Sequence, residues 1–386
     1  MRTQVTAAWL WDGQRLLADP ILTLESGHIT GVASRATAAL DPTAQHLDYP
    51  GATLAPAFFD VHIHGAAGHD VMEATPESLT AVSRFLASRG TGRFLATTVT
   101  APLDAILTSL SGLAGLIRQA ESTPLPGAQP VGIHLEGPFL SHLKRGVHPP
   151  AHLLEPDIAL FDRLYDAAEG YIRLLTLAPE LPHAAEFAAH AVSRGVRISV
   201  GHSNATAAET RAVLAAGATS ATHTYNAMRP LDHREPGILG TILTDDQTYA
   251  ELICDGIHVA PELVKLWFRA KGNQRALLVT DAMSATGMPD GEYQLGGFAV
   301  QVAEGRAMAG GVLAGSVLTL DRALQNFLAF TGTPIAEALP LLTTNPSAMT
   351  GLAEPTGTLH VGARADFLAL AAEGKLLAHH HPGQSL

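Results

Sequence analysis

Residues 58–70, FFDVHIHGAAGHD, join an apolar run to two closely spaced histidines. His62 and His64 lie two positions apart, and Gly65 follows them. Residues two apart on a strand point to the same face, so both imidazoles can reach one ion from a single backbone segment. Gly65 lets the chain turn there without a side chain that crowds the ion. The segment therefore predicts a buried strand with metal ligands at its carboxyl end.

The same arrangement recurs along the chain after about residue 52. Short apolar, β-branched runs that end in polar residues alternate with Ala- and Leu-rich helical segments. This alternation predicts consecutive βα units and a parallel sheet. Eight such units predict an α/β fold, a (β/α)8 barrel of the TIM type. The eight expected strands are 53–64, 92–98, 129–137, 171–180, 196–203, 219–227, 248–256 and 276–283.

The two ends of the chain differ from this rhythm. Residues 1–52 and 352–386 consist of short apolar runs with turn signals, and we expect them to pair into one small β domain. This domain would lie beside a metal-dependent catalytic barrel of residues 53–351. The Gly-rich segment 293–316 predicts a hairpin insert, and His379–His381 are expected to be a solvated end.

One helix start is well marked in the sequence. Glu209 stands three residues after Thr206, which is the spacing of a capping box, and Gly217 supplies a stop. These signals predict a helix over residues 206–217.

Composition excludes several classes of protein. The formal charge is -12, and the 24 basic residues form no run that would neutralise a nucleic acid backbone. The single cysteine, Cys254, permits no intrachain disulfide, so a metal site must be built from His, Asp and Glu. No apolar stretch of 18 residues is present, and we expect a cytoplasmic protein with no membrane or nucleic acid partner.

Ionisable residues collect at the expected strand ends. The carboxyl ends of all barrel strands face one mouth, where active sites are built. Imidazole and carboxylate ligands suit Zn²⁺ or Fe²⁺, so one or two divalent ions are expected, with zinc favoured. None of the four lysines ends an expected strand, so Glu136 is the best substitute for a carboxylated lysine, as a carboxylate able to bridge two ions or to bind one ion directly. The residues that converge are His62, His64, Glu136, His202, His223, Asp255 and Asp281.

Such a centre indicates hydrolysis. Water on zinc has a pKa near 7 and supplies hydroxide at neutral pH. Asp281 is then placed to take the proton of that water and to hand it to a leaving group.

A set of motifs along nearly the whole chain resembles one known family. The motifs are HIHG, HLEGPFL, KRGVHPP, GHSNA, HTYNAM, REPG, DGIHV, TDAMSATG, LAGS, NPSAMTGL and GARADF. HIHG alone is shared widely, whereas HLEGPF with KRGVHP, and HTYNAM with REPG, are specific in combination. The chain is similar to the N-acetylglucosamine-6-phosphate deacetylases of the amidohydrolase superfamily.

This resemblance implies roles for individual residues. Glu136, His202 and His223 would hold the principal metal, and Asp281 would be the catalytic acid/base. Some members lack the histidines of the first strand, whereas this chain keeps His62 and His64, which allows a second ion. His148, with Val147 beside it, would lie near the acetamide and help to polarise its carbonyl. The implied sugar phosphate contacts are Asn226, Ala227, Arg234, Asp255, Gly256, Ile257, His258, Leu313, Ala314 and Gly315.

The resemblance also implies a homodimer in which Arg234 and His258 reach the neighbouring active site. A phosphate dianion is bound well by the two parallel N–H donors of a guanidinium group together with further hydrogen-bond donors. Arg234 and His258 are residues of these types. The predicted reaction is hydrolysis of N-acetylglucosamine 6-phosphate to glucosamine 6-phosphate and acetate, by metal-bound hydroxide with Asp281 as acid/base.

Three alternatives remain open at this point. The chain could deacetylate a related substrate such as N-acetylgalactosamine 6-phosphate, and the phosphate contacts barely discriminate between the two sugars. An N-acyl amino acid substrate is disfavoured by the same contacts. A sugar phosphate sensor without catalysis would need a broken metal or acid/base set, and here that set is complete.

Overall fold

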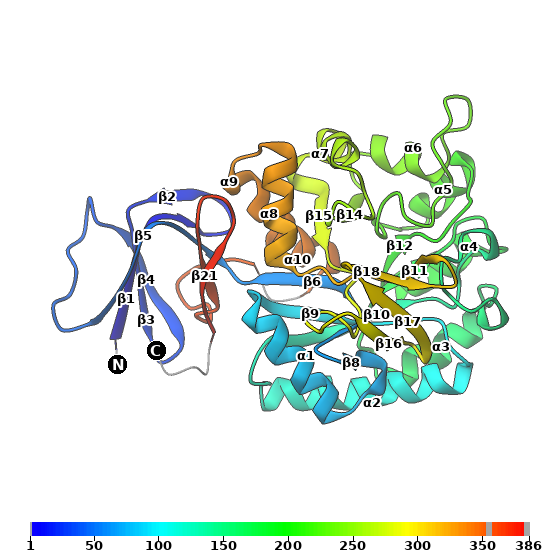
Figure 1. The fold of residues 1–386 in the computed structure, drawn as a ribbon, viewed down its shortest axis with the longest axis horizontal. Helices are drawn as coiled ribbons and strands as arrows, with labels where there is room; N and C mark the ends of the chain where they lie inside the picture. The colour runs from blue at the N-terminus through cyan, green and yellow to red at the C-terminus, as the bar shows by residue number, and fades with distance from the viewer. Residues whose placement is uncertain (1, 353–356, 382–386) are drawn as a thin grey trace.

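The computed structural model describes residues 2–352 and 357–381, and it shows a barrel beside a smaller sheet (Figure 1). The eight barrel strands are parallel and pair in chain order. Ile63 bridges to Ala282, just beyond the last strand, and so brings the first and last strands together. The predicted (β/α)8 barrel is confirmed. Its strands are β6 (Phe58–Ile63), β9 (Thr91–Thr98), β10 (Gln129–Glu136), β11 (Ile172–Leu177), β12 (Arg197–Val200), β13 (Ser220–Ala221), β14 (Tyr249–Ile253) and β15 (Ala276–Val279).

One helix longer than seven residues follows each barrel strand and covers the outside of the barrel (Figure 1). Each helix packs on the barrel through an apolar face. In the helix after β9 this face consists of Ile106, Leu110, Leu113 and Ile117, which are buried and recur at helical spacing. These eight helices are α1 (Pro76–Ser88), α2 (Leu103–Ser122), α3 (Ile158–Ala167), α4 (Ala184–Ser193), α5 (Ala207–Ala215), α6 (Gly237–Thr244), α7 (Pro261–Arg275) and α8 (Leu320–Thr331). The shorter ones are η1 (Val71–Glu73), η2 (His142–Lys144), η3 (Pro150–His152), α9 (Ile335–Ala338), η4 (Leu339–Leu342) and α10 (Thr344–Thr350).

Strands from both ends of the chain form the small sheet, as expected, with the order β21-β20-β5-β1-β3-β4 and β2 paired to β1. β1 and β5 are parallel, and the other pairs are antiparallel. The strands are β1 (Arg2–Trp11), β2 (Leu16–Ala18), β3 (Pro20–Glu25), β4 (His28–Ser34), β5 (Gln45–Pro56), β20 (Phe367–Leu370) and β21 (Leu376–His380).

Two expectations about these segments need correction. The run 53–64 is not one strand, because β5 ends at Pro56 in the small sheet and β6 begins at Phe58 in the barrel. The residue bounds of the two domains stay predictions. His379 and His380 are not a solvated end but part of β21: the His379 ring contacts Ala87 O and Asp366 Oδ1, and the His380 ring stacks on Phe367. Residues 353–356 and 382–386 of the expected β domain lie outside the described residues.

The Gly-rich insert forms the expected hairpin, extended to four antiparallel strands. Its attachment to the first barrel unit comes from Asp70, whose Oδ2 accepts from the backbone N of Gly296 at 2.7 Å. The insert therefore lies over the loop that follows β6. Its strands are β16 (Gly291–Leu295), β17 (Phe298–Ala303), β18 (Arg306–Ala309) and β19 (Val312–Leu313), and the loop beneath holds β7 (Gly65–Ala66) and β8 (His69–Asp70).

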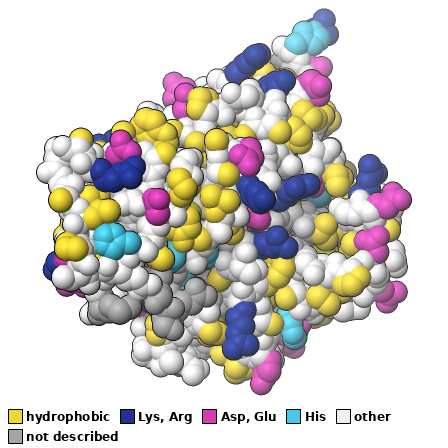
Figure 2. All heavy atoms as spheres, turned by 60° about the vertical axis from the view of Figure 1, so that its left-hand side comes forward, with side chains coloured by type: hydrophobic (Ala, Val, Ile, Leu, Met, Phe, Trp, Pro, Cys, Tyr) yellow, Lys and Arg dark blue, Asp and Glu magenta, His cyan; other side chains and the backbone are white. Residues whose placement is uncertain are grey.

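The surface carries charges of both signs. On the face drawn in Figure 2, basic side chains lie in small separated groups among acidic and apolar ones. Across residues 2–352 and 357–381, no helix has both the length and the apolar character that a membrane crossing requires. The cytoplasmic location and the lack of a nucleic acid partner stay predictions.

The capping box predicted for α5 is present, and it generates a stability prediction. Thr206 Oγ1 accepts from Glu209 N at 3.3 Å, and Glu209 Oε2 accepts from Thr206 N at 2.8 Å. We expect Thr206→Ala to lower the free energy of unfolding by about 1 kcal/mol, because the backbone N–H of Glu209 loses its partner. Urea denaturation followed by circular dichroism measures the change. Thr108→Ala, in the middle of α2 and exposed, is the control and should cost nothing; equal midpoints for the two variants would contradict the cap.

Candidate active site

Five of the seven ionisable residues predicted to converge line a cavity of about 310 Å³ at the carboxyl ends of the barrel strands: His64, Glu136, His202, His223 and Asp281. A larger cavity of about 510 Å³ lies at the amino ends of β9 to β11 but holds none of the predicted site residues. The chemistry of the lining therefore identifies the site better than its size does. The smaller cavity is lined by His64, Val99, Glu136, Leu143, Lys144, Gly146, Val147, His148, His202, His223, Asn226, Ala227, His258, Asp281, Leu295, Val312, Leu313 and Gly315.

Glu136, at the end of β10, lies at the centre of the buried histidines. Its Oε1 is 3.3 Å from His202 Nε2 and 3.3 Å from His223 Nε2, and these two nitrogens are 2.9 Å apart. Tetrahedral ligands about 2.0–2.1 Å from one zinc ion lie about 3.3 Å from each other, so the three atoms fit around one ion. His202 is oriented by Nδ1, which contacts Lys144 O at 3.0 Å and leaves Nε2 for the ion.

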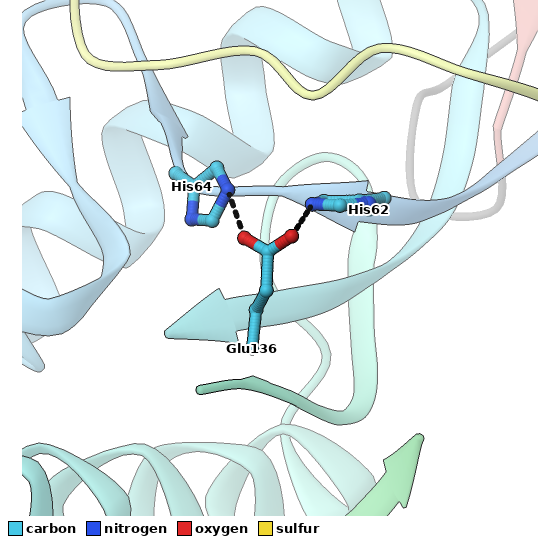
Figure 3. A group of neighbouring side chains, drawn as sticks. All are labelled: His62, His64 and Glu136. Carbon is cyan, nitrogen blue, oxygen red and sulfur yellow. Dashed lines mark ion pairs between the residues drawn. The ribbon is translucent and has the colours of Figure 1, made fainter. Parts of the chain in front are cut away.

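A second group of donors shares the same carboxylate. Figure 3 shows His62, in β6, and His64, directly after that strand, directed at the two oxygens of Glu136. His62 Nε2 is 3.4 Å from Oε1, and His64 Nε2 is 3.2 Å from Oε2. Asp281 Oδ1 completes the group, 3.5 Å from His62 Nε2 and 3.1 Å from His64 Nε2. Glu136 is therefore placed to bridge two ion positions.

The unpartnered atoms at this centre favour a bound cation. His62 Nε2 and Glu136 Oε1 are buried, and neither makes a hydrogen bond of good geometry within the described residues. A buried polar atom without a partner costs free energy, which metal coordination removes. Two triads of donors, His62 with His64 and Glu136, and Glu136 with His148 and His202, are close enough to hold an ion. The residues present therefore fit a divalent metal.

Charges at the centre shift several pKa values. Burial lowers the pKa of His64, but hydrogen bonds to Asp281 and Glu136 outweigh it and raise that pKa to about 9. The pKa of His62 also lies well above its usual value: burial opposes the shift, and the charges of Glu136 and Asp281 cause it. Burial raises the pKa of Asp281, but nearby His62 and His64 hold it well below its usual range. The same balance between burial and the histidines holds the pKa of Glu136 low. Each group is poised in the charge state that an ion pair requires.

His148 differs from the other histidines. Burial is the main cause of its lowered pKa, followed by the charge of His202, so the ring is neutral. Its Nδ1 accepts from the backbone N of Thr100 at 3.3 Å and contacts Thr100 Oγ1 at 2.8 Å. Since Nδ1 accepts, Nε2 carries the proton, and this atom lies 3.7 Å from Glu136 Oε2. The geometry makes His148 a neutral hydrogen-bond donor beside the carboxylate.

Several site residues have unusual backbone conformations. His202, His223 and Asp281 have φ of 46°, 26° and 51°, in the left-handed region that non-glycine residues rarely adopt. Such strain is held in place by neighbouring structure and clusters at functional sites. For Asp281 the support is visible, because its N donates to His62 O at 2.8 Å and its O accepts from Ser316 N at 2.7 Å.

The predicted sugar phosphate contacts divide into three groups. Val147, Asn226, Ala227, His258, Leu313 and Gly315 line the cavity. Asp255 does not, but its Oδ1 accepts from the backbone N of Ile257 and of His258, and its Oδ2 is 2.6 Å from His258 Nδ1, so it orients His258. Gly256 provides the turn between them with φ of 76°, and Ala314 is buried beside the lining residues. Arg234 is exposed and lies outside the cavity of its own chain.

Three features of the site were missed in the sequence. Lys144 lines the cavity although it ends no strand, and Leu143 and Val312 lie at the cavity while remaining 78% and 46% exposed. Glu251, in β14, is fully buried behind His62. A signal for Glu251 was available: it interrupts the apolar run Tyr249–Ile253, on the same strand face as Asp255. A charged residue in such a position is rarely buried without a partner.

Known proteins match this chain in sequence and fold. A model of the Amidohydrolase family matches residues 53–381. The chain is 40% identical over 365 residues to an N-acetylgalactosamine-6-phosphate deacetylase of Escherichia coli O157:H7, covering 94% of this chain and 91% of that protein. It is 36% identical to an N-acetylglucosamine-6-phosphate deacetylase of Bacillus subtilis (strain 168), covering 87% of this chain and 85% of that protein.

The structural comparison agrees. The fold matches a mutant N-acetyl-D-glucosamine-6-phosphate deacetylase from Mycobacterium smegmatis, solved in complex with N-acetyl-D-glucosamine-6-phosphate, with a TM-score of 0.92. The two are 35% identical, and the match covers 99% of this chain and 98% of that one. The chain therefore belongs to the amidohydrolase family and, within it, to the N-acetylglucosamine-6-phosphate deacetylases that its sequence resembles.

Proposed function

We propose that this enzyme hydrolyses the acetamide of N-acetylglucosamine 6-phosphate to glucosamine 6-phosphate and acetate. The observation that carries the proposal is Glu136, a buried carboxylate whose two oxygens face four histidines in one cavity. Relatives named N-acetylglucosamine-6-phosphate deacetylase support the choice of substrate.

Glu136, His202 and His223 would hold the principal divalent ion, which we propose is zinc, and His62 and His64 would hold a second. When bound, the ion supplies an activated water and polarises the amide carbonyl. The Asp281 carboxylate, which is ionised at neutral pH, would accept a proton from the attacking water and would deliver it to the nitrogen of the departing amine. Without this transfer the amine would leave as an unstable anion.

His148 would donate Nε2–H to the carbonyl oxygen of the acetamide. Its neutral state and fixed tautomer suit a donor that stabilises negative charge as it develops. Loss of one such donor costs about 10² to 10³ in rate. Val147, beside it, would contact the acetyl group.

Phosphate recognition would involve two subunits. Asn226, Ala227 and His258 line the cavity, with Asp255, Gly256 and Ile257 shaping the loop around His258. Arg234 lies outside the cavity in an exposed segment, three residues after Leu231, which is 57% exposed. We infer a homodimer in which Arg234 enters the neighbouring cavity and pairs with the phosphate. The expectation that His258 also reaches the neighbouring site is at odds with its place in the lining of its own cavity, where it would contact the phosphate. Leu313, Ala314 and Gly315 would form the wall of the cavity beside the sugar.

N-acetylgalactosamine 6-phosphate is the second candidate substrate. The 40% identical relative carries the name of that deacetylase, which favours it. The two substrates differ only in the orientation of one hydroxyl, so the metal centre and the acid/base would serve both.

The substrate assignment is tested by acetate release. Zinc-loaded protein is expected to release acetate from N-acetylglucosamine 6-phosphate, and far more slowly from N-acetylglucosamine, which lacks the phosphate. Asp281→Asn should lower kcat by about 10² to 10⁴ while substrate and the ion at Glu136, His202 and His223 still bind, because those three ligands are unchanged and proton transfer is lost. N-acetylgalactosamine 6-phosphate is measured in parallel. Near-normal turnover by the variant would remove Asp281 from the mechanism, and faster release from the galactosamine substrate would transfer the assignment to the second candidate.

The raised pKa of His64 predicts how the metal-free protein depends on pH. The folded protein binds a proton here up to about pH 9, whereas the unfolded chain releases it near pH 6.5, so stability is lost as the pH rises between these values. After chelation of metal, the urea concentration at the unfolding midpoint should be lower at pH 9 than at pH 7. His64→Gln should flatten this fall, and His183→Gln, at an exposed histidine, should not. A midpoint that is constant or rises over this range would contradict the assigned charges.

The dimer is tested by complementation. Arg234→Ala and Asp281→Asn are each expected to be nearly inactive, but a mixed dimer carries one site with both groups intact if Arg234 acts on the neighbouring subunit. Co-expression of the two variants should then restore about a quarter of wild-type activity, since half of the dimers are mixed and each has one working site. Activity no higher than that of the separate variants would show that Arg234 acts within its own chain.

A further inference from the structure

Glu251 is a fully buried carboxylate behind the metal centre, and it belongs to no motif that marks the family. It lies in β14, with 0% of its surface exposed. Its Oε2 is 3.1 Å from His62 Nδ1 and accepts from the backbone N of His223 at 3.2 Å. Its Oε1 has no hydrogen bond within the described residues. A carboxylate in this position is costly unless a positive partner compensates it.

The contact with His62 fixes which nitrogen faces the centre. An Nδ1–H that donates to Glu251 leaves the lone pair of His62 on Nε2. That nitrogen is the one that lies 3.4 Å from Glu136 Oε1 and 3.5 Å from Asp281 Oδ1. Glu251 therefore holds His62 in the tautomer that a metal ligand requires.

The other ligand histidines are held differently. The Nδ1 atoms of His64 and His202 contact backbone carbonyls, Thr97 O at 3.1 Å and Lys144 O at 3.0 Å. A carbonyl orients the ring but adds no full charge. A carboxylate also makes the ring more basic and offsets the charge of the ion. Within residues 2–352 and 357–381, a carboxylate thus contacts Nδ1 of His62, whereas backbone carbonyls take that place for His64 and His202.

We propose that Glu251 is a positioning residue for a second metal ion, held by His62, His64, Glu136 and Asp281. This inference rests on the metal centre of the proposed function, and it adds that the second position depends on Glu251 whereas the position at His202 and His223 does not. Glu251 would touch neither the ion nor the substrate, so its effect on the second position passes through the ring of His62. Its other contact is with the backbone N of His223 and not with the ring of that ligand.

The test measures zinc binding in the absence of any sugar. Metal-free wild type, Glu251→Gln and Glu251→Leu are titrated with Zn²⁺ against a chromophoric chelator, and bound zinc is counted by elemental analysis. We expect wild type to bind two equivalents. In both variants the affinity for the second equivalent should fall by about 10- to 100-fold. In the glutamine variant, whose amide oxygen can still accept from His223 N, the first equivalent should stay unchanged. The glutamine variant keeps the shape of the side chain, so it remains informative if the leucine variant does not fold.

Asp366→Asn is the matched control, since Asp366 Oδ1 also accepts from a histidine ring, His379 at 2.9 Å, but far from the metal centre. It should bind zinc as wild type does. Wild-type zinc affinity for both equivalents in the Glu251 variants would overturn the proposal. Equal weakening of both equivalents in the glutamine variant would also overturn it, as would a wild-type protein that binds only one equivalent of zinc. The deacetylase assignment is judged separately by acetate release, so zinc binding that behaves as expected without deacetylation would refute only that assignment.

Discussion

The buried carboxylate of Glu136 is the interaction on which the rest of the site depends. Its Oε1 lies within 3.4 Å of three histidine Nε2 atoms, and its Oε2 lies 3.2 Å from a fourth. In a low-dielectric interior such a carboxylate is stable only beside positive charge. Protonated histidines supply that charge in the metal-free protein, and a divalent ion supplies it in the loaded one. Glu136 therefore faces positive charge in both the metal-free and the metal-loaded protein. In the catalytic proposal, a divalent ion replaces the protons that the histidines carry in the metal-free protein.

The barrel makes this arrangement possible by bringing together residues that are far apart in the sequence. His62, Glu136, His202, His223 and Asp281 come from or follow five different strands, and parallel pairing places all of their carboxyl ends at one mouth. Left-handed backbone at three of these residues turns the side chains inward. The hairpin insert and the loop after β6 then narrow the mouth, and they are tied together through Asp70 and Gly296.

The sequence predicted the barrel, the paired ends of the chain and the residues that meet at the cavity. Strand periodicity and motifs were sufficient there, because each apolar run ends in polar residues. Parallel pairing of the strands in a barrel then places these ends at one mouth. Periodicity failed at residues 53–64, where two successive strands are both apolar and only their sheets differ. It failed again at His379, whose partners Ala87 and Asp366 become neighbours only after folding. Glu251 was missed for the same reason. The strand pattern indicates that its side chain points inward, but it does not indicate that His62 is its partner.

The location of bound metal distinguishes a catalytic centre at Glu136 from a structural ion pair. Crystals of the zinc-loaded protein are measured on both sides of the zinc absorption edge, and anomalous difference density shows where the ions lie. The account predicts one peak among Glu136, His202 and His223, and a second among His62, His64, Glu136 and Asp281. Well-ordered crystals without a zinc peak beside Glu136 would contradict it, because the buried carboxylate would then be a structural ion pair and not the ligand of a catalytic metal.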